Sequence, residues 1–202
     1  MFLINGLYGI TIGSDPCLED NVKAALAGGA TIIQYRDKSC SNEIKTRSAL
    51  RLKELCAGKA LFIINDDIAL AKSIDADGVH LGKNDADIKK ARQLLGKKII
   101  GVSCYNQLSL AEEAQAAGVD YVAFGRFFSS STKPDAVQAS PELLTRAKQT
   151  LSVPVVAIGG ITVNNADSLI KAGADAVAVI NGLFKQPEIK KTAQTFSKLF
   201  KN

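Results

Sequence analysis

Ala172-Gly173-Ala174-Asp175, followed at once by the apolar run Ala176–Ile180, is the stretch of sequence that decides the fold. Glycine after small helix-forming residues is typical of a helix C-terminus, and the short turn leads directly into a run of strand length. Related turns precede other apolar runs at Ala27-Gly28-Gly29-Ala30, Ala76-Asp77-Gly78 and Ala117-Gly118-Val119-Asp120. The sequence therefore predicts a repeated unit of helix, turn and strand.

Eight apolar runs of strand length alternate with helical patterns from end to end. They lack strict polar–apolar alternation, which is typical of parallel strands buried on both faces. We expect strands at Leu7–Thr11, Thr31–Arg36, Leu61–Ile64, Gly78–Leu81, Ile99–Ser103, Tyr121–Gly125, Val153–Ile158 and Ala176–Ile180. Helical patterns between them include Asn42–Cys56, Asp85–Leu95, Leu108–Ala117 and Asn164–Ala172.

Eight such units predict an α/β protein made of one (β/α)₈ barrel, or TIM barrel, as a single domain over residues 1–202. An open doubly wound sheet is the structural alternative. The number of strands and the lack of a GxGxxG motif after the first strand count against it.

The composition is that of an ordinary globular protein, with 47% hydrophobic and 22% charged residues. No apolar run is long enough to span a membrane, and the start Met1–Gly6 lacks the pattern of a signal peptide. Four scattered cysteines without a CxxC pair favour reduced thiols over zinc or disulfides. We therefore expect a cytoplasmic protein with no membrane partner.

The net charge of +5 is spread along the chain, with acidic residues among the basic ones. No nucleic-acid recognition motif accompanies it. We therefore expect small anionic ligands rather than nucleic acid as partners. A homo-oligomer is compatible with the sequence.

The run Gln34-Tyr35-Arg36-Asp37-Lys38 ends the second predicted strand in polar groups. Alternation along a strand would turn Gln34, Arg36 and Lys38 to the same side. Burying an amide and two cations is costly without a partner, and the neighbouring sequence supplies no obvious one. An anionic ligand such as a phosphate or diphosphate would meet this need. A local ion-pair network is the alternative.

Carboxylates follow the next two predicted strands. Asp66, within Asn65-Asp66-Asp67, and Asp85 would lie at adjacent strand ends, where they could share a hard cation. Magnesium binds through one or two carboxylates, with water and substrate phosphates as its other ligands. Helix capping is the alternative for both residues. The crowding of polar groups favours the functional interpretation for Asp66, and both interpretations of Asp85 stay open.

Two later strand ends carry features of phosphate sites. The run Ser129-Ser130-Ser131-Thr132-Lys133 offers hydroxyls, amides and an ammonium, although serine-rich loops are often only flexible. Gly159-Gly160 allows close approach of the backbone to a ligand, shortly before Asn164-Asn165 opens a helix. Phosphate sites in barrels often use the loops after strands seven and eight. The sequence thus predicts a second anion site across the barrel mouth from Arg36 and Lys38.

His80 is the only histidine and lies in Gly78-Val79-His80-Leu81-Gly82. It could act as a general base. A strand histidine between apolar residues is more often a hydrogen-bonded interior group, and we favour that interpretation.

Seven short motifs, in this order, resemble the thiamine-phosphate synthase family over essentially the whole chain. They are Gln34–Lys38, Ile64–Asp66, Gly78–Gly82 with Asp85, Gly101–Ser103, Tyr121–Gly125, Ser130–Pro134 and Ala157–Ile161. The resemblance implies a Mg²⁺-dependent transferase of thiamine biosynthesis. Such an enzyme joins 4-amino-5-hydroxymethyl-2-methylpyrimidine diphosphate to 4-methyl-5-thiazole-ethyl phosphate, or to its 2-carboxy form, and releases pyrophosphate.

The resemblance also implies a role for each matching residue. The pyrimidine diphosphate would be held by Gln34, Arg36, Lys38, Asn65 and Lys133, with Ser103 against the pyrimidine. Mg²⁺ would be bound by Asp66 and Asp85. The thiazole phosphate would be surrounded by Ser130, Thr132, Gly160, Ile180 and Asn181. Further substrate-binding positions would be Tyr35, Asp37 and Ser131, and the catalytic residues would be Arg36, Lys38, Ser103 and Lys133.

Two other functions are alternatives. A thiazole tautomerase shares the barrel, but its proton transfer is associated with a histidine shortly after strand five, where this chain has Cys104-Tyr105-Asn106. A non-catalytic sensor of phosphate ligands would be expected to lack Asp66, Lys38 or Lys133, and all three are present.

Overall fold

The computed structural model describes residues 4–13, 15–82, 88–129 and 138–201. In this part of the chain, eight parallel strands follow one another around a closed barrel, and the last strand pairs with the first. The strands are β1 Gly6–Ile10, β2 Ile32–Tyr35, β3 Leu61–Asn65, β4 Gly78–Leu81, β5 Ile99–Tyr105, β6 Tyr121–Phe124, β7 Val155–Ile158 and β8 Ala176–Val179. The predicted (β/α)₈ barrel is confirmed.

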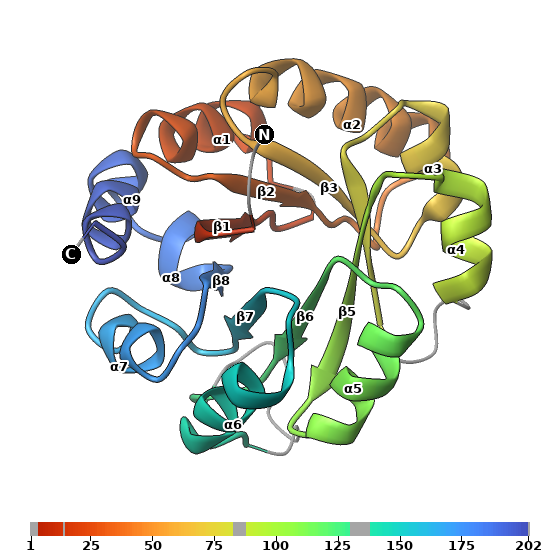
Figure 1. The fold of residues 1–202 in the computed structure, drawn as a ribbon. Coiled ribbons are helices and arrows are strands. Elements are labelled where there is room, and N and C mark those ends of the chain that lie inside the picture. The colour runs from red at the N-terminus through yellow and green to blue at the C-terminus, as the bar shows by residue number, and fades with distance from the viewer. Residues whose placement is uncertain (1–3, 14, 83–87, 130–137, 202) are drawn as a thin grey trace.

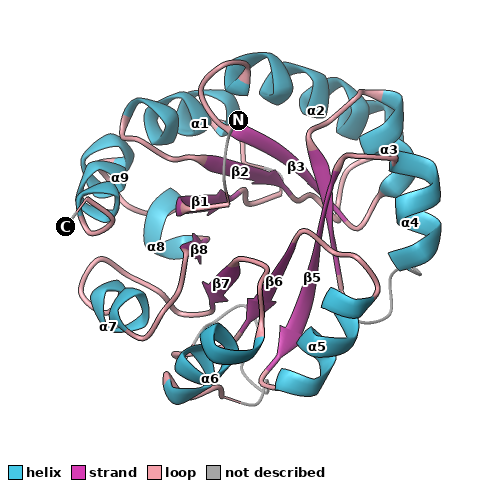
Figure 2. Cartoon of the chain, viewed as in Figure 1, coloured by secondary structure: helices cyan, strands magenta, loops and turns pink. Residues whose placement is uncertain are grey.

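Helices form an outer ring around the strands (Figure 1), and each strand is followed by helical structure before the next (Figure 2). Their bounds are α1 Leu18–Ala27, α2 Asn42–Cys56, α3 Ile68–Ser73, α4 Ile88–Leu95, α5 Leu108–Ala116, α6 Glu142–Thr150, α7 Ala166–Lys171, α8 Asn181–Phe184 and α9 Ile189–Lys198. The helix predicted at Asn42–Cys56 is confirmed at both ends. It begins there because the side chain of Ser41 accepts a hydrogen bond from the backbone N–H of Ile44.

Many predicted strand and helix boundaries differ from the structure by one or two residues, including three near the barrel mouth. Strand β2 ends at Tyr35, one residue before the predicted end. Strand β5 continues to Tyr105, and its register against β6 shifts between Ser103 and Tyr105. Helix α7 begins at Ala166 rather than Asn164, because the Asn165 side chain accepts from the backbone N–H of Thr162 and holds the preceding residues in a turn.

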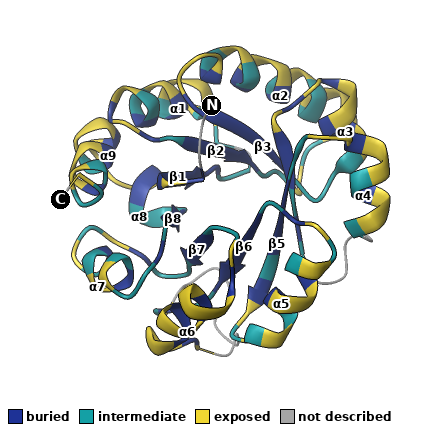
Figure 3. Ribbon diagram, viewed as in Figure 1, coloured by how far each residue is buried: buried dark blue, intermediate teal, exposed yellow. Residues whose placement is uncertain are grey.

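Alternate residues of most strands enter two separate apolar layers. The barrel interior contains residues such as Tyr8, Ile32, Ile63 and Tyr121. The residues between them face the helices and form the larger layer between strands and helices. Figure 3 shows the strands mostly dark, as buried residues, and the outer faces of the helices as exposed. Burial on both sides explains why the strands read as continuous apolar runs.

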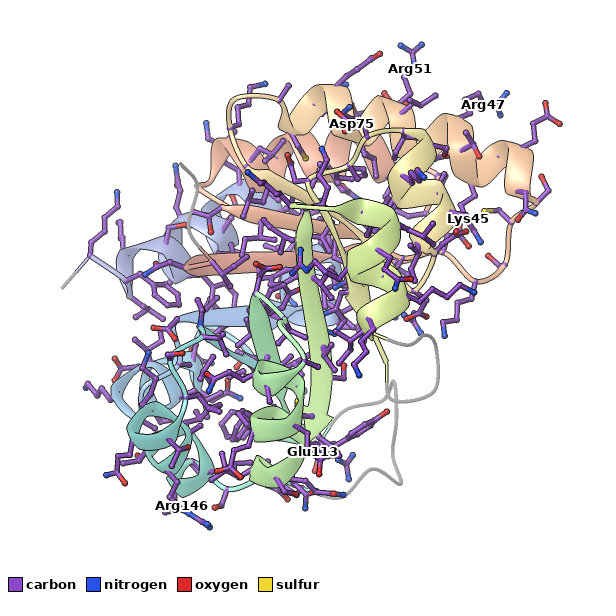
Figure 4. The ribbon with its side chains drawn as sticks, turned by 45° about the vertical axis from the view of Figure 1, so that its right-hand side comes forward. Lys45, Arg47, Arg51, Asp75, Glu113 and Arg146 are labelled. Atoms are coloured by element: carbon purple, nitrogen blue, oxygen red, sulfur yellow. The ribbon has the colours of Figure 1, made fainter. Side chains whose placement is uncertain are left out.

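Charged side chains cover the outer helices. In Figure 4, Lys45, Arg47 and Arg51 project outward from α2, away from the barrel. A shallow hollow of about 720 Å³ lies on this outer face, lined by Asn42, Glu43, Thr46, Arg47, Leu50, Arg51 and Glu54. Among the described residues, no helix is long and apolar enough to cross a membrane.

Candidate active site

Gln34 lies inside the barrel rather than at its rim. Its side chain is buried, and its amide donates a hydrogen bond of 2.7 Å to the hydroxyl of Tyr8 on β1. The neighbouring sequence supplies no obvious partner for this amide, and the partner in the structure comes from a strand 26 positions earlier in the chain. A ligand is therefore not needed to offset the burial of Gln34.

Arg36 and Lys38 lie beyond the end of β2, so the alternation of a strand does not extend to them. The backbone N–H of Arg36 donates to the hydroxyl of Thr11 at 3.0 Å, which ties this loop to the end of β1. Arg36 is half-buried, whereas Lys38 is exposed. Thr11 is a structural residue of this rim that the sequence analysis did not identify.

Tyr35 and Asp37, the residues on either side of Arg36, support the loop itself. The ring of Tyr35 packs into the layer between strands and helices, so it faces away from the barrel interior. Burial raises the pKa of its hydroxyl. The carboxylate of Asp37 accepts from the backbone N–H and the hydroxyl of Ser39. These contacts give Tyr35 and Asp37 structural roles in holding the loop.

Lys38, Asn65 and Asp66 form a polar cluster at the ends of β2 and β3. The ammonium of Lys38 lies 3.4 Å from the Asp66 carboxylate, and the amide of Asn65 donates to the same oxygen at 2.6 Å. The side chain of Lys38 is 63% exposed and that of Asp66 is 27% exposed. The structure thus contains the ion pair that the alternative interpretation expected, at a place that an entering ligand can reach.

Asp66 and Asp67 have different conformations and different uses. Asp67 caps α3, because its carboxylate accepts from the backbone N–H of Leu70 at 2.9 Å. Asp66 has a φ of +65°, in the left-handed region that residues other than glycine seldom adopt. Its own N–H donates to the carbonyl of His80, which holds Asp66 at the rim between β3 and β4. Helix capping therefore belongs to Asp67 and leaves the Asp66 carboxylate at the mouth.

Ser103 and His80 meet inside the barrel on neighbouring strands. Nε2 of His80 lies 2.9 Å from the hydroxyl of Ser103, and Nδ1 lies 2.9 Å from the hydroxyl of Tyr121. The interpretation of His80 as a hydrogen-bonded interior residue agrees with these contacts. Ser103 itself is half-buried.

A cavity of about 220 Å³ opens at the ends of β7 and β8. It is lined by Ser129, Ile158, Gly159, Gly160, Ile161, Thr162, Ala178, Ile180, Asn181 and Gly182. The structure therefore brings Gly160, Ile180 and Asn181 together, as the sequence analysis expected of residues sharing a ligand. In a closed barrel of eight strands, β7 lies across from β3, so this cavity faces the cluster around Asp66.

Gly160 is required by the shape of this cavity. Its φ is +66°, and a Cβ there would lie 2.5 Å from the Ser129 carbonyl oxygen and 2.6 Å from that of Phe128. The carbonyl of Gly160 accepts from the side chain of Asn165 at 3.1 Å. The close approach of backbone to backbone leaves no room for a side chain at Gly160, and the predicted close approach of a ligand stays a prediction.

Several predicted site residues lie outside the described residues. They are Asp85, Ser130, Ser131, Thr132 and Lys133. Their assignments to Mg²⁺ and to the substrates stay predictions. Among the described residues, no three His, Cys, Asp or Glu side chains gather into a group that could hold a metal ion by themselves.

Comparison with known proteins identifies the family. The thiamine monophosphate synthase family model matches residues 7–183. A thiamine-phosphate synthase of Thioalkalivibrio sulfidiphilus is 47% identical, with 98% of this chain and 96% of the relative covered. One from Nitrosococcus oceani is 50% identical, covering 98% and 93%. The chain belongs to the thiamine monophosphate synthase family.

One solved structure agrees with this family membership, and a second agrees with the fold. Thiamine phosphate pyrophosphorylase from Pyrococcus furiosus superimposes with a TM-score of 0.89 at 34% identity, covering 97% of this chain and 95% of that one. A thiamine phosphate pyrophosphorylase from Bacteroides thetaiotaomicron shares the fold, with a TM-score of 0.74 at 16% identity. The resemblance in seven short motifs is therefore confirmed at the level of the family and of the whole fold.

Two interior residues of this family member were missed as site residues. Tyr8 was absent from the expected set, and Tyr121 entered only as part of a motif. The available signal was their position, because each is a tyrosine at an interior position of a buried strand, where its hydroxyl needs a polar partner. The partners could not be deduced, since the two tyrosines are 113 positions apart in the chain.

Proposed function

We propose that this barrel mouth joins the pyrimidine diphosphate to the thiazole phosphate, which yields thiamine phosphate and pyrophosphate. The observation that carries the proposal is the pairing of two regions. The cationic and carboxylate cluster at the ends of β2 and β3 lies across from the glycine-lined cavity at the ends of β7 and β8. A reaction between two phosphorylated substrates needs two such regions. Family membership supports the same reaction.

The chemistry asks little covalent work of the protein. The bond between the pyrimidine methylene carbon and the diphosphate oxygen breaks, and pyrophosphate leaves with the electron pair. The electron-rich aminopyrimidine stabilises the resulting cation, which the thiazole nitrogen then attacks to form the new C–N bond. Arg36 and Lys38, with Lys133, would stabilise the charge that develops on the leaving group. The opposing cavity would hold the thiazole nitrogen in line with the carbon.

The oxygen donors at the mouth fit Mg²⁺. Asp66 presents a carboxylate at the rim, and Asp85 would add a second one. Mg²⁺ typically binds one or two carboxylates and takes its remaining ligands from water and substrate phosphates, so a larger cluster of acids is not required. When bound, the ion would neutralise charge on the diphosphate. Asn65 and Lys38 would keep the Asp66 carboxylate oriented toward it.

We also propose that the enzyme works in the cytoplasm on small-molecule substrates. All four cysteines are free, and two of them, Cys56 and Cys104, are buried. Free thiols are typical of a reducing compartment. Subcellular fractionation of the native protein, probed with an antibody, tests this placement.

A coupled assay tests the proposed reaction. The purified chain is mixed with both substrates and Mg²⁺, and pyrophosphate and thiamine phosphate are measured together. We expect equal amounts of both products and no product when either substrate is left out. Isomerisation of the carboxythiazole phosphate alone would point to a tautomerase. Binding of thiamine phosphate without turnover would point to a sensor, and either result would overturn the proposal.

A further inference from the structure

A chain of hydrogen bonds crosses the inside of the barrel and joins five strands. The Gln34 amide donates to the Tyr8 hydroxyl at 2.7 Å, and the hydroxyls of Tyr8 and Tyr121 lie 2.8 Å apart. Tyr121 lies 2.9 Å from Nδ1 of His80, and Nε2 of His80 lies 2.9 Å from Ser103. The chain therefore connects Gln34, expected to bind the diphosphate, with Ser103, expected to contact the pyrimidine.

The geometry of this chain is built into the barrel. Tyr8 and Tyr121 are fully buried in the interior layer, with ring centroids 6.1 Å apart at an angle of 66°. The Tyr121 ring stacks on His80 at 5.5 Å. Gly101 makes room for it, because a Cβ at that position would lie 1.9 Å from the Tyr121 ring. Interior packing thus fixes the rings before any substrate arrives.

The direction of each hydrogen bond follows from Gln34. A tyrosine hydroxyl has one proton to donate. Tyr8 accepts from Gln34, and within the described part of the chain its proton has no acceptor except Tyr121. A buried hydroxyl proton without an acceptor is costly, so Tyr8 donates to Tyr121. The Tyr121 proton must then go to Nδ1 of His80.

The tautomer of His80 determines the direction of the last hydrogen bond, between His80 and Ser103. An imidazole that accepts at Nδ1 and is neutral carries its proton on Nε2. It therefore donates from Nε2 to the oxygen of Ser103. Ser103 consequently accepts from the protein and keeps its own proton for a bond to another group. Burial raises the pKa of both tyrosines, so both hydroxyls remain protonated donors.

We propose that Tyr8, Tyr121 and His80 are positioning residues that orient the Ser103 hydroxyl as a hydrogen-bond donor to an acceptor atom of the pyrimidine substrate. This inference rests on the proposed function for the identity of that substrate. Through the same series of hydrogen bonds, Gln34 determines from across the barrel interior that the Ser103 hydroxyl is free to donate. Neither tyrosine needs to touch the substrate.

The tautomer of His80 tests the direction without any substrate. Because His80 is the only histidine, a two-bond ¹H–¹⁵N correlation spectrum of the ¹⁵N-labelled, tag-free protein shows a single imidazole. We expect the neutral form with its proton on Nε2. A proton on Nδ1 would mean that His80 donates to the Tyr121 hydroxyl instead of accepting from it, and would overturn the proposal. An imidazolium at neutral pH would overturn it too.

Two variants distinguish the effect of Tyr121 on the His80 tautomer from that of Ser103. Ser103→Ala should keep the Nε2–H tautomer, because Tyr121 still donates to Nδ1. Tyr121→Phe should lose that preference, because it removes the donor. Tyr105→Phe removes an exposed tyrosine hydroxyl from the end of β5 and should keep the wild-type spectrum. An unchanged tautomer in a folded Tyr121→Phe protein would contradict the chain.

A double-mutant cycle then tests whether Tyr121 acts through Ser103. We expect Tyr121→Phe to lower kcat about 10- to 100-fold, as misplaced reactive groups do, with little change in KM for the thiazole phosphate. In the Ser103→Ala background the same substitution should cost less than about twofold. Equal losses in both backgrounds would show a merely structural role and refute the positioning.

The two hypotheses fail in different ways. A wild-type chain that forms no thiamine phosphate would remove the proposed function, and the tautomer result would still stand or fall by itself. If the protein is active but His80 has its proton on Nδ1, the proposed function stands and the proposed direction of the hydrogen bonds is wrong.

Discussion

Lys38 is the residue whose surroundings best separate a catalytic role from a structural one. Its ammonium pairs with Asp66 at 3.4 Å but remains 63% exposed. Exposed ion pairs contribute at most about 1 kcal/mol to stability, whereas a cation beside a departing diphosphate can contribute several times more to the transition state. The same side chain thus matters little to folding and much to the proposed reaction.

Lys38→Ala should therefore lower kcat about 100-fold while shifting the free energy of unfolding by less than about 1 kcal/mol. Pyrophosphate release and urea unfolding measure the two quantities. Lys23→Ala is the matched control, since it removes the same charge from an exposed pair with Asp20 at 3.0 Å on α1. Full activity of the Lys38 variant would remove that residue from the catalytic set.

Gly160→Ala should raise KM for the thiazole phosphate about tenfold, equivalent to about 1.4 kcal/mol. The added methyl would collide with the carbonyl oxygens of Ser129 and Phe128, which border the cavity. Gly96→Ala is the control, because Gly96 has a similar φ of +59° but open space around it. Both variants should lose stability from the left-handed backbone. Equal KM values for the two variants would show that backbone strain alone was measured.

At the scale of elements, the repeated turn before a strand also supplies a hydrogen-bond acceptor to the neighbouring strand. Aspartates at the starts of β4, β6 and β8 accept from the backbone of the strand before. Asp77 accepts from the N–H of Phe62, Asp120 from that of Ile100, and Asp175 from that of Val155, at 2.7 to 2.8 Å. These bonds join adjacent strands, β3 to β4, β5 to β6 and β7 to β8, at the end of the barrel opposite the mouth. Residues at that end of a barrel serve stability rather than catalysis.

Asp77→Ala should destabilise the fold by about 1 to 3 kcal/mol, because the N–H of Phe62 loses a charged acceptor. The kinetic constants should stay unchanged, since this end of the barrel is remote from the mouth. Asp77→Asn keeps an oxygen acceptor without the charge and should recover part of the loss. Urea unfolding and the coupled assay together check this. A lowered kcat in the folded Asp77→Ala protein would contradict the separation of the two ends.

The elements were predictable where local chemistry decides them. All eight strands overlap their predicted ranges, because burial on both faces imposes apolar runs, and α2 has its predicted bounds because Ser41 caps it. The positive φ of Asp66 and the register shift after Ser103 were not predictable, since both depend on the neighbouring strand. The contact of Gln34 with Tyr8 was missed for the same reason. Contacts between residues far apart in the chain thus could not be predicted from the sequence.

On the scale of the whole molecule, the closed barrel separates stability from reactivity. The interior and the helix layer hold the apolar core, and the strand ends carry the polar clusters. The core nevertheless contains ionisable groups, including two cysteines and three tyrosines with raised pKa values. Because these buried groups resist ionisation in the folded protein, the stability of the whole fold should decrease at alkaline pH.

We expect the free energy of unfolding to fall as the pH rises from about 9 to 12. Burial raises the pKa of Cys56 and of Cys104 from 9.0 to about 12. Between these values the unfolded chain releases each thiol proton while the folded chain keeps it, so unfolding becomes more favourable. Each thiol should contribute a slope of about −1.4 kcal/mol per pH unit in that window and none below it. Urea unfolding under reducing conditions, at steps from pH 8 upward, measures the slope.

Cysteine variants separate the thiols from the lysines that lose charge over the same range. Cys104→Ala should start from a lower stability, because it leaves a small cavity, but it should show a shallower decline with pH. Cys17→Ala removes an exposed thiol and should decline as steeply as the wild type. If all three proteins lose stability at the same rate above pH 9, buried thiols do not drive the alkaline unfolding. A shallower slope for Cys104→Ala alone would show that the core itself senses pH, independently of the chemistry at the barrel mouth.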